Sequence, residues 1–203
     1  MSFESSDDEA GARLLKTALQ LFASLGYDGT TTDMLAEAAG VTRETVMRAG
    51  GRAGLYHAAM QHANDELAEI TREALTRVSR DRAGLHALLD AHMDFYFEHP
   101  ESLFLWSHRA LSDAADLTDI EERYSRPIYR LVADAFGGSR LLDLTDEYRM
   151  STNILDWCLR GFVVGGIQKF DGTVSGPSDP HARESFRASM HRLMEAVLPP
   201  EAG

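Results

Sequence analysis

Apolar residues recur at three- and four-residue intervals along most of the chain, which is the pattern of amphipathic helices and predicts an all-α fold. The first clear apolar face consists of Leu14, Ala18, Leu21, Phe22 and Leu25. Ser6 and Glu9 have the spacing of a capping box, so this helix is predicted to begin at Ser6. Gly26 suits its end, and Thr30 and Thr31 provide hydroxyls that can cap the next helix.

Residues 31–46 have the sequence TTDMLAEAAGVTRETV, which predicts two short helices joined by a glycine turn. Ala36 offers a small side chain where two helices cross, Gly40 suits a turn with positive φ, and Val46 can fill the crossing. A helix-turn-helix has this arrangement, and its second helix enters the major groove of DNA. The alternative interpretation is an ordinary helical hairpin.

Helical spacing continues through the rest of the chain, interrupted by proline, glycine and polar segments. The expected helices cover about residues 52–80, 85–97, 100–111, 117–136, 141–170 and 181–198. Pro127 predicts a kink or break in the helix that contains it, and residues 171–180 form a Gly/Pro-rich loop. No alternating segment predicts a strand of useful length. We therefore expect about nine helices in two domains, a helix-turn-helix domain over residues 1–54 and a larger helical domain over 55–203.

Charge and composition narrow the class of protein. The 203 residues carry a net charge of −12, which argues against non-specific adhesion to nucleic acid over the whole surface. Residues 13–60 hold five basic and four acidic side chains, so the motif lies in the least acidic part of the chain. No run approaches the roughly 18 apolar residues of a membrane span, and the acidic N-terminus lacks the apolar stretch of a signal peptide. The single cysteine, Cys158, makes no internal disulfide. These features predict a cytoplasmic protein with no membrane partner.

The sequence contains no cluster typical of catalysis or metal binding. His57 and His62 are five positions apart and do not align as two ligands on one helix face. His108 has no neighbouring ligand at helical spacing, and Cys158 has no partner at the spacing of a zinc site. Motifs such as GxSxG, HExxH or a Gly-rich phosphate loop are missing. We expect no enzyme activity, no metal and no cofactor.

Residues 13–46 resemble the DNA-binding domain of the TetR family of bacterial transcription regulators. The matching elements are Leu21-Phe22, Gly26-Tyr27, Thr30-Thr31, Leu35-Ala36, Ala38-Ala39-Gly40-Val41 and Thr45. The remaining residues are similar to the family in helical layout only. The resemblance implies a homodimer with a variable ligand-binding domain, in which the last two long helices of each subunit form a four-helix interface.

The resemblance also implies which residues contact DNA. Thr31 would cap the first motif helix and touch a phosphate, and the recognition helix would run from about Arg43 to Ala49. The candidate set for DNA contact is Thr31, Thr42, Arg43, Glu44, Thr45, Met47, Arg48 and Arg52. Two physical arguments agree with it. A helix N-terminus offers free N–H groups to phosphate, and arginine suits guanine edges or phosphates.

The chain departs from the family pattern at several positions of the motif. The departures are Met47 for a tyrosine, Gly50 for a buried phenylalanine, Ala53 for a lysine that contacts phosphate, and Asp33 for a basic or neutral residue. The lost lysine and the added carboxylate predict weaker phosphate binding. Gly50 and Gly51 predict a looser join to the next helix, by roughly 1 kcal/mol each relative to alanine, if they are helical. Arg48 and Arg52 are candidates to replace the missing charge.

Aromatic and polar side chains between residues 93 and 157 have the mixture found in ligand pockets. The candidates are Met93, Tyr96, Phe97, Phe104, Trp106, His108, Tyr124, Tyr129, Met150, Asn153 and Trp157. The same spacing is also typical of a plain core, and we expect about half of the set to touch a cavity. Arg109 and Arg160 are the nearest basic residues, which favours a neutral or cationic, partly aromatic effector over a polyanion.

Gly161, Gly165 and Gly166 indicate that another backbone approaches the predicted helix 141–170 closely, because glycine otherwise destabilises a helix. A partner helix of a homodimer is one interpretation, and a ligand lying against the helix is the other. The candidate dimer interface consists of Leu155, Gly161, Phe162, Gly165, Gly166, Ile167, Met190, Leu193 and Met194.

These features predict a homodimeric regulator, a repressor, that binds a pseudo-palindromic operator in double-stranded DNA and is released by a small-molecule effector. The alternative is a helical small-molecule-binding dimer in which DNA binding has degenerated or been lost. The departures from the family pattern in the motif motivate this alternative.

Overall fold

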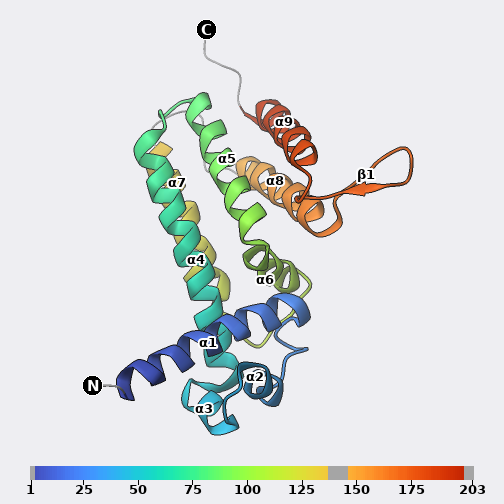
Figure 1. The fold of residues 1–203 in the computed structure, drawn as a ribbon. Coiled ribbons are helices and arrows are strands. Elements are labelled where there is room, and N and C mark those ends of the chain that lie inside the picture. The colour runs from blue at the N-terminus through green and yellow to red at the C-terminus, as the bar shows by residue number, and fades with distance from the viewer. Residues whose placement is uncertain (1–2, 137–145, 199–203) are drawn as a thin grey trace. The chain divides into compact units, whose positions relative to one another are not determined.

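Nine α-helices and one short hairpin make up the part of the chain that the computed structural model describes, residues 3–136 and 146–198 (Figure 1). The helices are α1 (Phe3–Leu25), α2 (Thr32–Ala39), α3 (Arg43–Arg48), α4 (Gly51–Arg77), α5 (Arg82–Glu98), α6 (Pro100–Ala110), α7 (Arg126–Phe136), α8 (Asp146–Gly165) and α9 (Pro180–Val197). Strands β1 (Ile167–Gln168) and β2 (Val174–Ser175) form the hairpin between α8 and α9. The predicted all-α class with about nine helices is confirmed.

The hairpin corrects the prediction for the end of the long helix near the C-terminus. α8 ends at Gly165 and does not continue to Phe170. Gly166 has φ 67°, which ends the helix, and the chain then turns back so that Ile167 pairs with Ser175. Gly172, at φ 82°, lies in the connecting turn. The predicted start of this helix, residues 141–145, lies outside the described residues.

The structure also differs from the prediction in where two helices begin. α1 begins at Phe3, ahead of the predicted cap Ser6. The helix predicted to begin near residue 117 begins with η1 (Glu121–Ser125), a turn of π-helix that leads directly into α7. Pro127 therefore lies in the first turn of α7, where its missing N–H is tolerated. The irregularity predicted at Pro127 is thus located just ahead of it.

The chain divides into two compact units. Within the described residues, unit 1 comprises 3–66 and 101–126, and unit 2 comprises 67–100, 127–136 and 146–198. This division describes packing, and a domain boundary near residue 54 stays a prediction.

The unit 1 core brings residues of the 101–126 segment together with the N-terminal helices. Its most deeply buried large side chains are Phe22, Leu35, Val46, Tyr56, Met60, Leu105 and Ile120. The ring of Tyr56 lies edge-on to Phe22, with 5.2 Å between centroids, and 5.0 Å from the ring of Tyr27. Burial raises the pKa of Tyr56 well above its usual range. This core supports the inner faces of α2 and α3.

Unit 2 is packed around aromatic rings and ion pairs that join α5 to α9. The rings of Phe162 and Phe186 stack at 4.3 Å, and Phe97 lies edge-on to Phe162 at 5.6 Å. Asp90 of α5 accepts from Arg187 and His191 of α9, each at 2.7 Å. The α5–α9 packing is therefore both apolar and ionic.

Candidate nucleic-acid interface

The α2–α3 pair turns at a residue whose backbone conformation favours glycine. Gly40 has φ 65° and ψ 36°, in the left-handed region, and its N–H donates to the carbonyl oxygen of Glu37 at 3.1 Å. The N–H of Val41 donates to the carbonyl of Ala36 at 3.0 Å. Ala36 is 8% exposed and Val46 is 0% exposed, so both belong to the unit 1 core. The predicted arrangement of small residue, glycine and β-branched residue is confirmed.

Threonine hydroxyls cap both helices of the motif. Thr31 precedes α2 and accepts the N–H of the residue three positions later at 3.2 Å. Thr42 does the same for α3, accepting the N–H of Thr45 at 3.2 Å. Thr30 is buried and is not a cap, because its hydroxyl donates to the carbonyl of Gly26 at 2.7 Å. One of the two threonines predicted for this role therefore closes the preceding turn.

The outer face of the α2–α3 pair carries most of the predicted DNA contacts. Exposed members of the set are Thr31, Thr42, Arg43, Glu44, Met47 and Arg48, while Thr45 and Arg52 are half-buried. Arg43 donates to both carboxylate oxygens of Asp33, at 3.0 and 3.2 Å. These two side chains are 67% and 70% exposed, and an ion pair so open to water contributes little stability. Arg43 is therefore held loosely on the surface.

Arg52 has a different environment from the other predicted contacts. Its guanidinium lies 4.0 Å from the centroid of the Tyr27 ring. It also donates to the carbonyl oxygens of Tyr27 at 3.3 Å and Thr30 at 3.4 Å. Sequence reasoning offered Arg52 as a substitute phosphate contact. The structure brings it against the turn between α1 and α2, where it has a structural role.

The glycines after α3 meet a backbone requirement that the sequence analysis missed. Gly50 has φ 92° and Gly51 has φ 66°, so both lie where other residues are strained. A β-carbon on Gly50 would also lie 3.0 Å from the α-carbon of Gly54. The predicted loosening relative to alanine assumed helical glycines, but Gly50 lies between the helices, and Gly51, the first residue of α4, has a left-handed φ that alanine would not adopt without strain. The glycines allow the tight join between α3 and α4.

A carboxylate from the segment after α6 binds the turn that follows α1. Asp113 accepts the N–H of Tyr27 at 2.7 Å and that of Asp28 at 2.8 Å. This residue has no signal in the sequence, because its partners are 86 and 85 positions away. Its contacts were not predicted.

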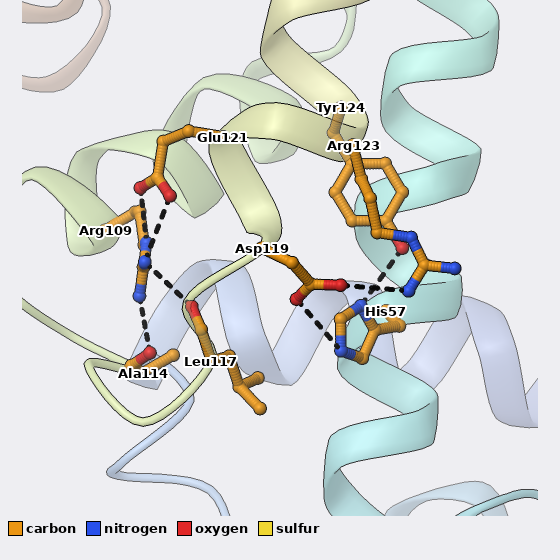
Figure 2. A network of polar contacts seen from close by, with 8 residues as sticks. All are labelled: His57, Arg109, Ala114, Leu117, Asp119, Glu121, Arg123 and Tyr124. Atoms are coloured by element: carbon orange, nitrogen blue, oxygen red, sulfur yellow. Dashed lines mark hydrogen bonds and ion pairs between the residues drawn. The ribbon is translucent and has the colours of Figure 1, made fainter.

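Arg109 of α6 holds the same segment in place (Figure 2). Its guanidinium donates to the carboxylate of Glu121 at 2.6 and 3.1 Å and to the carbonyl of Leu117 at 2.9 Å. It also donates to the carbonyl oxygens of Asp113 and Ala114. The hydrogen bond from Arg109 lowers the pKa of Glu121, so the pair is ionised at neutral pH. One half-buried arginine head therefore fixes the course of the chain from residue 113 to 121.

The other end of this segment is tied to α4 through His57 (Figure 2). Its Nδ1 lies 3.1 Å from the hydroxyl of Tyr124, and its Nε2 lies 4.0 Å from a carboxylate oxygen of Asp119. Asp119 also accepts from Arg123 at 3.2 Å. His57 is thus a contact between α4 and the 119–124 segment.

The predicted pocket residues are divided between the two units. Unit 1 contains Phe104, Trp106, His108 and Tyr124, and unit 2 contains Met93, Tyr96, Phe97, Tyr129, Asn153 and Trp157. In unit 1, Tyr124 is buried in the core and His108 hydrogen-bonds the carbonyl of Ala23 at 3.0 Å. In unit 2, burial raises the pKa of Tyr96, while Trp157 is 59% exposed. The side chain of Met150 lies outside the described residues.

The predicted dimer residues differ in how far their own chain covers them. Phe162, Met190 and Met194 are buried within unit 2, Leu155 and Leu193 are half-buried, and Ile167 is 39% exposed. A β-carbon on Gly161 or Gly165 would meet no atom of the described chain within 4 Å. At Gly166 it would meet Val174 of the hairpin at 2.8 Å. Among the described residues, a close approach from the same chain occurs at Gly166 and not at Gly161 or Gly165. The predicted approach of a partner helix or ligand stays a prediction.

The described ranges hold neither a candidate metal site nor a candidate membrane span. No three or more His, Cys, Asp or Glu side chains gather there as ligands for a metal ion. None of the helices within those ranges is long and apolar enough to cross a membrane.

Known proteins match the chain at the level of both sequence and fold. Residues 14–58 match the model of the bacterial regulatory proteins of the tetR family. An HTH-type transcriptional activator, FasR of Mycolicibacterium smegmatis, is 32% identical over 93 residues, which are 45% of this chain and 42% of that protein. The match thus spans less than half of that relative.

Solved structures extend the similarity of fold to nearly the whole chain. A TetR family regulator from Marinobacter aquaeolei matches with a TM-score of 0.70 and 18% identity, covering 98% of this chain and 100% of that one. A putative tetR family regulator from Shewanella gives 0.72 and 16%, covering 95% and 99%. A ketosteroid transcriptional regulator of Mycobacterium tuberculosis gives 0.67 and 16%, covering 95% and 96%.

The capped helix-turn-helix, its exposed arginines and the match over residues 14–58 indicate a domain of the class that binds DNA in transcriptional regulators. Residues 14–58 therefore resemble the tetR family of bacterial regulatory proteins, and the fold of nearly the whole chain is similar to that of solved TetR family regulators.

Proposed function

We propose that the protein is a homodimeric repressor that binds a pseudo-palindromic operator and leaves it when a small-molecule effector binds. The observation that carries the proposal is the outer face of α3, where Arg43 and Arg48 are exposed on a rigidly capped and buried scaffold. Two such helices in a dimer would enter successive major grooves, whose spacing is fixed by the duplex. We place DNA reading in residues 1–54 and effector binding and dimerisation in residues 55–203, without catalysis, in the cytoplasm.

Repression is the simpler of the two directions of control. A repressor needs only to occupy DNA, whereas an activator also needs a surface that helps transcription start. The relative from Mycolicibacterium smegmatis is named an activator. Footprinting measures where the operator lies relative to its promoter, and a reporter gene measures whether expression falls or rises. Together they distinguish repression from activation.

For the dimer we propose the exposed side of α8 and the hairpin as the partner surface. Trp157 is 59% exposed, Val164 is 61% exposed and Ile167 is 39% exposed. Gly161 lies between Trp157 and Val164 in sequence, and Gly165 follows Val164. A β-carbon on either glycine would meet no described atom within 4 Å. Contiguous apolar exposure of this kind marks a surface that another protein covers. Sedimentation of the purified chain tests this, and a monomer at micromolar concentration would contradict it.

The effector is proposed to be neutral or cationic and partly aromatic, because the pocket candidates are aromatic and contain few basic groups. Native mass spectrometry of protein purified without added ligand tests this class by the mass of a retained compound. A retained polyanion, such as a nucleotide, would contradict it.

The DNA-binding part of the proposal is tested with fluorescent duplex from the DNA flanking the gene. Saturable, selective binding that weakens steeply with salt is expected, because affinity depends on neutralised phosphates. Arg43→Ala and Arg48→Ala should each weaken binding about tenfold, within the range for a lost base contact. Arg72→Ala is the matched control, since Arg72 is an exposed arginine on α4 whose ion pair is with Glu69 of the same helix.

A second function, a helical ligand-binding dimer without DNA binding, is favoured by two observations. Ala53 leaves no side-chain amine where the family has a lysine, and the carboxylate of Asp33 already occupies Arg43. A folded dimer that shows no selective DNA binding even at low salt would establish this second function and exclude the first.

A further inference from the structure

The turn at residues 26–30 presents adjacent backbone N–H groups to a single carboxylate. Tyr27 and Asp28 both donate to Asp113, one to each of its oxygens, at 2.7 and 2.8 Å. Gly26, at φ 74°, leaves room for this contact, because a β-carbon there would lie 2.9 Å from an Asp113 oxygen. Charge-assisted hydrogen bonds to a carboxylate are among the stronger polar contacts in proteins. Asp113 is therefore bound by the turn as an anionic ligand would be.

The backbone on both sides of Asp113 is strained to make this contact. Ser112 has φ 68° and Ala114 has φ 55°, and they are the non-glycine residues with positive φ in the described chain. Such conformations cost free energy and persist only where surrounding contacts hold them. The contacts here are the bonds from Arg109 to the carbonyls of Asp113, Ala114 and Leu117. The segment is thus held in a shape that it would not adopt alone.

The turn that Asp113 binds is directly connected to the DNA-reading helices. Thr30 closes the turn on Gly26, and the next residue, Thr31, caps α2. Arg52 also holds the turn, by stacking on Tyr27 and donating to the carbonyls of Tyr27 and Thr30. The position at which α2 begins, and through Gly40 that of α3, therefore depends on this turn.

We propose that Asp113 is a positioning residue for DNA binding: its carboxylate fixes the 26–30 turn and thereby the placement of α2 and α3 before DNA is met. The inference rests on the proposed DNA-binding function. A reading head fixed in advance loses less conformational freedom on binding and so binds more tightly. Asp113 itself contacts no DNA, so its loss changes affinity without changing the number of phosphates neutralised.

The first test is made on the wild-type protein by amide hydrogen exchange, with and without the duplex that it binds selectively. Coupling between two sites is reciprocal, so DNA should slow the exchange of the Tyr27 and Asp28 amides although neither contacts it. Unchanged exchange at both amides in the saturated complex would overturn the proposal. This measurement does not depend on whether any variant folds.

The second test compares Asp113→Ala and Asp113→Asn with Asp116→Ala, a control that removes an exposed charge from the same segment. Asp113→Ala should bind the duplex about tenfold more weakly, the factor for a lost charge-assisted bond network, with an unchanged salt slope. Asp113→Asn keeps one acceptor and should be intermediate, and Asp116→Ala should bind at least as well as wild type. Equal affinity of Asp113→Ala and wild type overturns the inference, whereas a wild type that binds no DNA overturns the proposed function instead.

Discussion

Units 1 and 2 differ in how completely each covers its own apolar side chains. In unit 1 the large apolar residues left exposed are scattered: Leu25, Met47 and Leu111. In unit 2 they are Tyr129, Trp157, Val164, Ile167, Phe170 and Val174, and all but Tyr129 belong to α8 or the hairpin. Scattered exposure is normal for a soluble protein, and gathered exposure indicates a surface that a partner covers. Unit 1 therefore covers most of its own apolar side chains, and unit 2 leaves an apolar surface on which we propose that a second copy packs.

The largest expected effect is a loss of stability in unit 1, caused by a charge placed in its core. Val46 is fully buried and its neighbour Met47 is 57% exposed, so the same substitution at the two positions compares the inner and outer faces of α3. Val46→Asp should lower the free energy of unfolding by about 4 kcal/mol, because it buries a charge without a partner. Met47→Asp should lower it by less than about 0.5 kcal/mol. Urea denaturation measures both, and equal losses would contradict the inner and outer assignment.

Acid should destabilise unit 2 through a half-buried histidine that is neutral in the folded protein. Burial lowers the pKa of His92 to about 4, and its Nε2 lies 2.9 Å from the hydroxyl of Thr71. Because the unfolded chain binds the proton with the ordinary pKa of about 6.5, stability is complete above that pH. It is lost as pH falls from 6.5 towards 4, by at most about 3 kcal/mol.

His92→Gln tests this origin, since glutamine does not titrate. The difference in unfolding free energy between wild type and His92→Gln should shrink as pH falls through this range. The same substitution at the exposed His62 is the control for replacing a surface histidine. Parallel curves for wild type and His92→Gln would show that another group carries the pH dependence.

Gly161→Ala tests whether a partner packs on the exposed side of α8 in unit 2. The added methyl group meets nothing in its own chain, and alanine favours a helix by about 1 kcal/mol. If a partner helix packs there, as proposed, the methyl group should weaken the dimer about tenfold through overpacking. Gly11→Ala in α1 also has free space and should leave the dimer unchanged. Sedimentation at several concentrations measures both, and a dimer of undiminished affinity in Gly161→Ala would place the partner elsewhere.

The smallest effect concerns the outer face of unit 1. Asp33→Asn removes the carboxylate that holds Arg43 and should strengthen DNA binding about threefold with a steeper salt dependence, since another cation becomes free for phosphate. Glu37→Gln removes an equal charge from the exposed surface of α2 and should have a smaller effect. Weaker binding by Asp33→Asn would mean that Asp33 orients Arg43 instead of competing for it.

The parts of the motif that sequence predicts are those whose causes are local. Gly40, Val46 and the caps Thr31 and Thr42 act within a few residues of their own position, so spacing and residue type suffice to find them. The nine helices are predicted for the same reason. The exposure of Met47 and Arg48 is predictable as well, because their helical spacing turns them away from the buried face that contains Val46.

The parts that sequence misses depend on contacts between distant positions or on backbone angles. Asp113 is an ordinary loop aspartate until the fold brings it to Tyr27. Arg52 has a charge suited to phosphate, and only the structure shows that its guanidinium already contacts the ring of Tyr27 and two backbone carbonyls. The positive φ of Gly166 that ends α8 cannot be distinguished in a sequence from a glycine inside a helix.

The sharing of one core by residues 3–66 and 101–126 limits how this protein can be recombined with others. Leu105 and Ile120 are 1% and 0% exposed in the same core as Leu35 and Val46. A hybrid regulator made by joining this N-terminal segment to a foreign sensor would lose these side chains and leave the reading head incompletely filled. The portable module is therefore discontinuous in sequence, and exchange of specificity between relatives has to carry both segments together.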